Sequence, residues 1–258
     1  MTVPPAALAP EMQAALRQEG FQALCPLAGG QQQVWLVRWR GRLAVVKVRQ
    51  RAFCRRLIKE AHWLRWAAGQ GLPVPRLLAE LGNEHFHALM LAPVPADRRP
   101  RSPSTYLQAL IPLHQRPAAA GWGPLRADLL PRWPQADAAL QWYLQRLKAL
   151  APAQERTIAN ELQTSWPAAK TVHIHGDLHR GNFRGRVILD WESVALADSA
   201  DEAARLALAG GWSQPWRWLG LNQHHPRWRG AWLRSLIESA SYPGPRRHRA
   251  WALLTAAR

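Results

Sequence analysis

The chain has 258 residues, 48% of them hydrophobic, and a formal net charge of +17. This length suits one large domain or two lobes, and no apolar run approaches the roughly 18 residues needed to span a bilayer. The beginning of the sequence lacks the basic start and apolar stretch of a signal peptide. Its two cysteines, Cys25 and Cys54, are expected to be free thiols, which predicts a cytoplasmic protein.

The positive charge comes almost entirely from arginine. Of the 34 basic residues only four are lysine. Such a charge raises nucleic acid or an anionic membrane surface as partners. Arginine is spread along the whole chain, however, and the densest group, residues 98–101, is interrupted by Pro100. Nucleic acid is therefore disfavoured as a partner, although a binding role for the Arg- and Trp-rich tail, 212–258, remains an alternative.

The first part of the chain predicts a small antiparallel sheet with helices. Hydrophobic periodicity and turn residues define these elements. We expect a helix over 6–19, a turn-rich stretch over 25–33, strands over 34–39 and 43–48, a helix over 52–67, and strands over 76–81 and 85–91. Pro93 and Pro95 then mark a linker. The chain thus predicts an N-terminal nucleotide-binding lobe, residues 1–92.

The remainder, residues 93–258, predicts a larger helical lobe that carries the chemistry. We expect helices over 106–114, 136–150, 153–165, 199–209, 226–240 and 245–258, with a short hairpin over 182–190. Strands in the first lobe and helices in the second make an α+β fold.

The most informative stretch of the sequence is the loop from His175 to Asn182. It places Asp177 five residues before Asn182, and a second aspartate, Asp190, follows eight residues later. Phosphoryl transfer from ATP uses such a trio. Asp177 is expected to contact the acceptor hydroxyl as the catalytic carboxylate, and Asn182 with Asp190 to hold Mg²⁺ against the phosphates.

The position of Asp190 favours this interpretation over a solvated acidic face or a set of helix caps. Asp190 ends the apolar run of residues 187–189, which is typical of a buried strand. A carboxylate at the end of such a strand is costly unless it is paired or bound to a metal ion.

Lys47 lies within another apolar strand, where an ammonium group needs a negative partner. Glu60 in the following helix can supply one and hold the lysine over the α- and β-phosphates of ATP. The alternatives are a lysine that reaches water and a glutamate paired with Arg56. Gly29 and Gly30 precede the first predicted strand, where glycine lets backbone N–H groups approach phosphate.

Four further residues are candidates for bracing the catalytic loop or facing the substrate. His175 can hydrogen-bond to the loop, and His179 can steady Asp177 or the γ-phosphate. Asp198 and Glu202 begin a predicted helix, so helix capping is an equally good explanation for them.

These residues resemble the aminoglycoside phosphotransferase and choline kinase superfamily. The family loop H-G-D-x-x-x-x-N is matched by His175, Gly176, Asp177 and Asn182, and its I-D-W-E motif by residues 189–192. Its lysine of the third strand falls on Lys47, and its following acidic motif is partly matched by Asp198 and Glu202. The resemblance implies a protein-kinase-like two-lobed fold, with a small antiparallel β N-lobe and a larger helical C-lobe, and ATP and Mg²⁺ as cosubstrate and cofactor.

Within that superfamily the middle region resembles bacterial thiamine kinase. The similar segments are 113–117, 121–122 and 140–148, together with the Trp- and Arg-rich tail. The resemblance implies a small hydroxylated acceptor, with thiamine as the first choice.

Charge and aromatic content bear on the choice of acceptor. Aminoglycosides are polycations, and Glu238 is the only acid after Glu202, which counts against them. A monocation such as thiamine, choline or ethanolamine needs fewer acids and can use aromatic faces. The candidate rings are Trp122, Trp142, Trp191, Trp212, Trp216 and Trp218.

Two further alternatives remain. A sugar, glycolipid or other anionic acceptor fits the arginine excess. A catalytically silent, kinase-shaped binding protein fits the small number of glycines, only Gly29 and Gly30, in the turn-rich stretch before the first predicted strand. Protein substrates are disfavoured, since the seven residues between Asp190 and Asp198 leave no room for a long activation segment.

Overall fold

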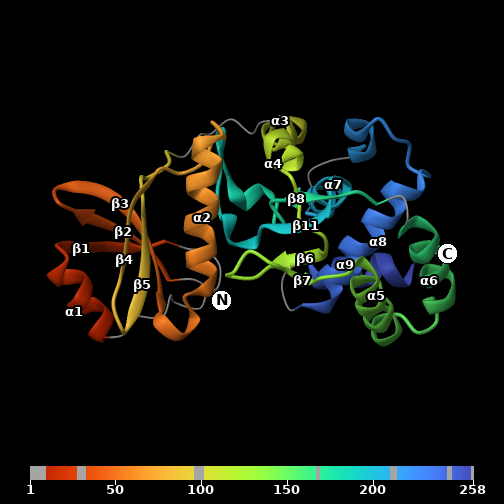
Figure 1. Cartoon of the computed structure of the whole chain (residues 1–258), viewed down its shortest axis with the longest axis horizontal. Coiled ribbons are helices and arrows are strands. Elements are labelled where there is room, and N and C mark those ends of the chain that lie inside the picture. Colours follow the sequence, from red (N-terminus) through yellow and green to blue (C-terminus); the bar gives the residue numbers. More distant parts are fainter. Residues whose placement is uncertain are drawn as a thin grey trace. The chain divides into compact units, whose positions relative to one another are not determined.

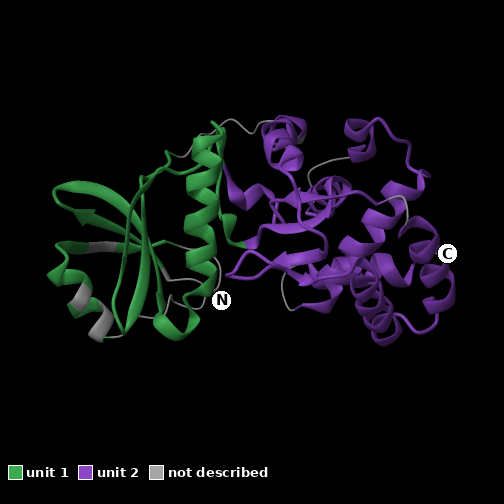
Figure 2. Cartoon of the chain, viewed as in Figure 1, with its two compact units in different colours: residues 1–99, 184–192 green, residues 100–183, 193–258 purple. Residues whose placement is uncertain are grey.

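The computed structural model describes residues 10–27, 33–95, 102–166, 169–209, 214–242 and 246–256. The chain divides into two compact units (Figure 2). Unit 1 comprises residues 1–99 and 184–192, and unit 2 comprises residues 100–183 and 193–258. Antiparallel sheets and helices together give the α+β composition that the sequence predicts. The predicted boundary between functional lobes at residue 92 stays a prediction.

A five-stranded antiparallel sheet forms the body of unit 1, in the order β1-β2-β3-β5-β4 (Figure 1). Its strands are β1 (Phe21–Pro26), β2 (Gln33–Trp39), β3 (Arg42–Gln50), β4 (Leu77–Gly82) and β5 (Phe86–Leu91). The β2–β3 hairpin turns at Arg40 and Gly41, whose φ angles of 48° and 75° suit a two-residue turn. Four strands lie where the sequence predicts them. β1 was missed because turn-forming residues follow it closely.

The two faces of this sheet pack against different helices. Alternate residues of β3, namely Ala44, Val46 and Val48, are buried in a core shared with Leu16 of α1 (Pro10–Gln18). The period of two along a strand puts Lys47 on the opposite face. On β5 the same alternation places Leu89 on the opposite face, in a separate hydrophobic cluster. Leu57 and Ala61 of α2 (Arg55–Gly69) complete that cluster. A 3-10 turn, η1 (Arg51–Phe53), precedes α2.

A short segment distant in sequence completes unit 1. It contains β10 (Val187–Ile188), which pairs with β9 (Phe183–Arg184), and the 3-10 turn η4 (Trp191–Ser193). The Ile188 N–H donates to the Pro73 carbonyl at 2.7 Å. The Trp191 indole donates to the Ile188 carbonyl at 3.0 Å. Both side chains are fully buried, so packing and hydrogen bonds fix the residues on either side of Asp190.

Unit 2 contains a four-stranded sheet that the sequence did not predict. Its order is β7-β6-β11-β8. The strands are β6 (Trp122–Leu125), β7 (Pro131–Trp133), β8 (Thr171–Ile174) and β11 (Ala195–Asp198). Each has only three or four residues, and β11 is buried throughout, so none shows the alternation that identifies a half-exposed strand. No helix was predicted over these segments, so the small sheet adds to a second part that is mostly helical, as predicted.

The helices of unit 2 fall close to their predicted ranges. They are α3 (Pro103–Ala109), α4 (Ile111–Gln115), α5 (Ala136–Leu150), α6 (Glu155–Ser165), α7 (Ser199–Leu208), α8 (Pro226–Ser241) and α9 (Arg247–Thr255), with 3-10 turns η3 (Arg180–Asn182) and η5 (Pro215–Leu219). Apolar side chains from α5, α6, α8 and α9 share one core with strands of the sheet. Inside it Arg234 of α8 binds Asp201 of α7, with Nε 3.0 Å from Oδ1. Among the helices described, none has the length and apolar character to cross a membrane.

Candidate active site

Lys47 is the centre of a charge cluster in unit 1. Its Nζ lies 2.6 Å from Oε1 of Glu60 and 2.9 Å from Oδ1 of Asp190. The lysine side chain is 12% exposed and the glutamate 1%, so this pair lies largely out of water, whereas the Asp190 side chain is 33% exposed. The structure therefore brings together three of the residues that the sequence singled out, from β3, α2 and the segment after β10.

Burial and charge act in opposite directions on these groups. Burial alone would lower the pKa of Lys47, but the carboxylates of Glu60 and Asp190 outweigh it and hold that pKa above its usual range. The lysine is therefore charged at any working pH. Burial raises the pKa of Glu60 to about 7, although Lys47 lowers it. An ammonium held by two acids is poised to bind phosphate oxygens.

Asp190 has a backbone conformation that few residues adopt. Its φ is 63°, in the left-handed region, where a side chain other than glycine is uncommon and aspartate is better tolerated than most. Its neighbours Ile188 and Trp191 are fully buried and fix the chain on both sides. Such local strain is typical of functional positions, where the surroundings impose the conformation.

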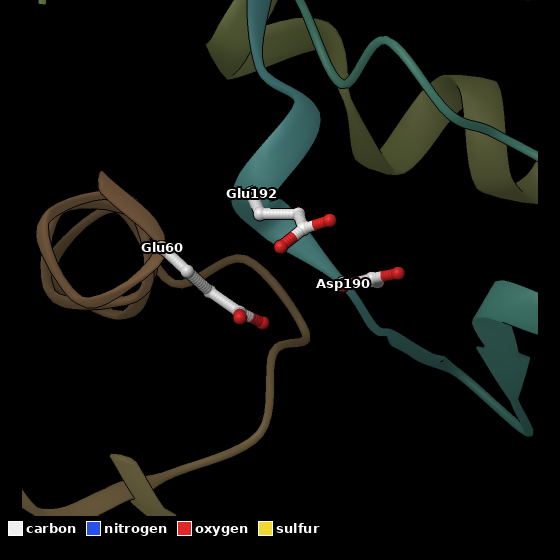
Figure 3. Close-up of side chains that lie close together, drawn as sticks. All are labelled: Glu60, Asp190 and Glu192. Carbon is white, nitrogen blue, oxygen red and sulfur yellow. The ribbon is translucent and has the colours of Figure 1, made fainter. Parts of the chain in front are cut away.

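Glu192 is a third acid in this cluster that the sequence analysis did not assign to the site. Figure 3 shows it with Glu60 of α2 and with Asp190, and one oxygen of each carboxylate lies within 4.8 Å of the others. Arg49 and Arg56 lie 3.8 and 3.5 Å from its carboxylate. The signal for Glu192 was its place in the motif of residues 189–192. Carboxylate oxygens are ligands that Mg²⁺ accepts, so the donor set fits that ion. Gly29 and Gly30 lie outside the described residues.

The predicted catalytic loop lies in unit 2 and begins directly after β8. Gly176 has a φ of 83°, and a Cβ added there would lie 2.1 Å from the carbonyl oxygen of Ser193. Only glycine fits, because both the conformation and the space exclude a side chain.

Replacing Gly176 with alanine should therefore destabilise the protein more than replacing Gly220, whose φ is 67° but whose Cβ would meet nothing within 4 Å. Gly220→Ala is expected to cost about 1–2 kcal/mol, the cost of positive φ alone. Gly176→Ala should cost at least about 1 kcal/mol more, because the Ser193 backbone must also shift. Urea unfolding of both variants measures the difference, and equal losses would contradict the close approach.

Three side chains of the same unit contact Asp177, namely Arg246, His179 and Asn182. Arg246 places Nη2 2.9 Å from its Oδ1. His179 places Nε2 3.5 Å from Oδ2, while its Nδ1 accepts a hydrogen bond from the Gly181 N–H at 3.0 Å. Burial alone would raise the pKa of Asp177, but the hydrogen bonds from His179 and Arg246 hold it well below the usual range. Asp177 is therefore ionised throughout the physiological range.

Asn182 closes the loop onto Asp177. Its amide nitrogen donates to the Asp177 carbonyl at 2.9 Å and to Oδ2 at 3.3 Å. With the nitrogen committed in this way, the amide oxygen is the atom that can meet a metal ion. Arg246 was not predicted as a site residue, because 69 residues separate it from Asp177 and it belongs to a tail rich in arginine.

Glu202 of α7 holds the backbone at the start of the loop. Its carboxylate accepts the backbone N–H groups of His175, at 2.8 Å, and Gly176, at 3.0 Å. His175 is fully buried, and its Nδ1 lies 3.4 Å from the Asp177 backbone nitrogen. Asp198 occupies a different place. It caps α7 through the Ala200 N–H and binds Arg227, with Nη2 2.8 Å from Oδ1.

Glu202 gives the protein a pH dependence that can be measured. Burial raises the pKa of its carboxyl to about 7, against the two backbone N–H groups that lower it. The folded state then binds a proton more tightly than the unfolded state, whose value is about 4.3. The free energy of unfolding should fall as pH rises from about 4 to 7, by up to about 1.4 kcal/mol per pH unit for one such group. Asp201 and Glu60, whose pKa values burial raises to about 6 and 7, add to this slope.

Glu202→Gln should flatten this slope, since it removes one titrating group. Urea unfolding at several pH values measures the slope for wild type and variant. Glu84→Gln is a matched control because the Glu84 side chain is 84% exposed. An unchanged slope in Glu202→Gln would show that Glu202 titrates normally in the folded protein.

Three of the six tryptophans considered for binding a cationic acceptor are buried or lie beneath arginines, and Trp218 lies edge-on to His114. Trp122 is buried, and the Arg234 guanidinium lies 5.2 Å from its ring centroid. Two arginines lie over Trp142, at 5.6 and 5.8 Å. Trp191 is part of the core of unit 1, and Trp212 lies outside the described residues. Trp216 lines a cavity of about 430 Å³ in unit 2 with Trp228 and Trp232.

Solved structures of known proteins share this fold. An aminoglycoside phosphotransferase, APH(4)-Ia, superimposes with a TM-score of 0.72 at 16% identity and covers 96% of this chain and 99% of its own. A complex of a mutant of that enzyme with ADP and hygromycin B gives a TM-score of 0.68 at 16% identity, over 95% of this chain and 96% of its own. A protein from Haemophilus somnus 129PT, assigned as a fructosamine-3-kinase, gives 0.67 at 16% identity, over 94% and 95%. These similarities confirm the predicted protein-kinase-like fold.

A search of curated proteins gives no significant match. The family model described as the phosphotransferase enzyme family, in contrast, matches residues 23–251. That range contains nearly the whole chain and includes Lys47, Asp177, Asn182 and Asp190. It confirms the resemblance found in the sequence. The chain therefore belongs to the phosphotransferase enzyme family.

Proposed function

We propose that this chain transfers the γ-phosphate of ATP to a hydroxyl group of a small metabolite, with Mg²⁺ as cofactor. The observation that supports this most is the buried ammonium of Lys47 held by Glu60 and Asp190. A structural salt bridge needs only one acid. Two acids on one lysine, one of them on a strained backbone, suit a site that exchanges partners when a phosphate arrives.

Lys47 binds the α- and β-phosphate oxygens, and Glu60 keeps it in place. Asp190 and Asn182 are the residues that would hold Mg²⁺, as the sequence predicts, and Glu192 is a further candidate. Mg²⁺, when bound, supplies positive charge against the phosphate oxygens. The similar structure with ADP supports ATP as the cosubstrate.

Asp177 orients the acceptor. Its ionised carboxylate accepts a hydrogen bond from the acceptor hydroxyl and aligns that oxygen with the γ-phosphorus. A bond forms from the hydroxyl oxygen to phosphorus, and the bond from phosphorus to the β–γ bridging oxygen breaks, with its electrons left on ADP. The hydroxyl proton passes to Asp177 and then to water. Glu202 and His175 hold the loop, and His179 fixes the second oxygen of Asp177.

The acceptor is a small hydroxylated molecule. The sequence put a cation such as thiamine first, and thiamine stays a prediction. In the described part of unit 2, arginines already lie over Trp122 and Trp142, and most acids bind arginine or backbone groups. A cation would find few open partners there apart from the cavity lined by Trp216, Trp228 and Trp232. A sugar-type acceptor is supported better. It fits the similar structure assigned as a fructosamine-3-kinase.

The deciding experiment is Mg²⁺-dependent ATP consumption with a panel of thiamine, choline, ethanolamine, kanamycin and simple sugars. Acceptor-dependent formation of ADP that is lost in Asp177→Asn supports a kinase. Mg²⁺-dependent binding of ATP without turnover on any acceptor would instead support a silent, kinase-shaped binding protein.

We also propose a cytoplasmic location. Cys25 and Cys54 are both free thiols, as the sequence predicts. Cys25 is exposed, so it would be vulnerable to oxidation elsewhere.

A further inference from the structure

Arg246 binds one of the two carboxylate oxygens of Asp177. It precedes α9, and its Nη2 lies 2.9 Å from Asp177 Oδ1, with both side chains 31% exposed. The other oxygen, Oδ2, already faces His179 and Asn182. An acceptor that approaches Asp177 must therefore take Oδ1 from Arg246 or share it. The partly exposed pair is open to such an exchange.

The surroundings of this pair in unit 2 are positive. The first turn of α9 continues with Arg247, His248 and Arg249, all exposed. Arg180, next to His179 in the loop, is exposed as well. A cation would meet repulsion here, whereas an anion would meet several donors.

The acids of unit 2 are largely committed and cannot compensate for this charge. Apart from Asp177, those with defined partners bind arginine or backbone groups. They are Asp128, Glu161, Asp198, Asp201, Glu202 and Glu238. Asp137 and Glu155 lie in the first turns of α5 and α6.

We propose that Arg246 is a specificity-determining residue that selects an acceptor with a carboxylate or phosphate group close to its reactive hydroxyl. The anionic group takes the guanidinium from Asp177, and the hydroxyl takes the vacated oxygen. One ion pair replaces another, and the hydrogen bond from the acceptor hydroxyl takes the place of the arginine at Asp177. A neutral or cationic acceptor would break the pair without replacing it, which disfavours its binding. This inference rests on the proposed kinase function and names the acceptor class for it.

The first test compares matched acceptors in ATP turnover. The pairs are glucose with glucose 6-phosphate, glycerol with glycerol 3-phosphate, and glucose with gluconate, which separates phosphate from carboxylate. Wild type should prefer the anionic member by at least tenfold in kcat/KM. Arg246→Ala should lose that preference, mainly through KM, and Arg246→Lys should keep part of it, because lysine retains the charge without the planar fork. Arg156→Ala, at an exposed arginine of α6 away from this group, should keep the preference in full. Equal or better turnover of neutral or cationic acceptors by wild type would overturn the proposal.

A second test does not require the true acceptor. Inorganic phosphate and acetate are titrated against protein saturated with Mg²⁺ and AMP-PNP, so that the nucleotide site is filled, at constant ionic strength. Calorimetry should show saturable binding of at least one anion that weakens at least tenfold in Arg246→Ala and stays unchanged in Arg156→Ala. Equal affinity for the anion in all three proteins, or no binding of either anion to any of them, would overturn the role of Arg246. Failure of AMP-PNP itself to bind would instead count against the proposed kinase function.

Discussion

Asp177→Asn should lower kcat by roughly 10²–10⁴-fold while the Kd for Mg²⁺·ATP changes little. The asparagine keeps the size of the side chain but removes the charge that orients the hydroxyl and receives its proton. Lys47 and its two acids belong to unit 1 and do not depend on Asp177. Turnover should therefore fall without a matching loss of nucleotide binding.

Steady-state kinetics with the best acceptor and calorimetry with AMP-PNP measure the two quantities separately. Asp137→Asn is the matched control, because Asp137 is exposed in the first turn of α5. Its kcat should equal that of wild type. A value of kcat in Asp177→Asn within about threefold of wild type would mean that Asp177 does not touch the reacting hydroxyl.

Lys47→Met should abolish ATP binding and also destabilise the protein by about 3–5 kcal/mol at pH 8, the cost of leaving a buried charge without its partner. Glu60 is 1% exposed, so without Lys47 its negative charge at pH 8 would be buried with no cation beside it. Because burial already raises the pKa of Glu60 to about 7, the glutamate is largely protonated at pH 5. The destabilisation should therefore be smaller at pH 5 than at pH 8.

The double variant Lys47→Met/Glu60→Gln separates the two effects. It removes both buried charges, so much of the stability should return, whereas ATP binding should not. Lys148→Met, on an exposed lysine of α5, controls for loss of a lysine. Tight ATP binding by Lys47→Met would refute the role of Lys47, and a double variant no more stable than the single one would refute the pairing with Glu60.

Local patterns were enough to predict the elements that carry most of the site. The β2–β3 hairpin is two apolar runs around Arg40 and Gly41, and α5 begins and ends at the predicted residues, 136 and 150. Lys47 and Asp190 stood out because a charge in an apolar run is costly, and the structure shows both with partners of opposite charge. The cost of burying a charge therefore pointed to both Lys47 and Asp190, which lie 143 positions apart in the chain and pair with each other.

Other features could not be read from the sequence, since they depend on contacts between distant segments. The strands of the four-stranded sheet in unit 2 are too short and too buried to show an alternation of polar and apolar residues. The sheet is therefore recognised only from the hydrogen bonds between its strands. Arg246 looked like one of many arginines, and only the fold brings it to Asp177. Asp198 and Glu202 looked alike, yet one caps a helix and the other holds the loop backbone.

The assignment of residues 184–192 to unit 1 limits how this protein can be divided. A fragment ending at residue 99 would have the whole five-stranded sheet, yet it would lack Ile188, whose backbone binds Pro73, and Asp190, which binds Lys47. Its key lysine would have one carboxylate instead of two. Expression of residues 1–99 alone should therefore fail to give a nucleotide-binding module, and any exchange of unit 1 between homologues would have to include residues 184–192 together with residues 1–99.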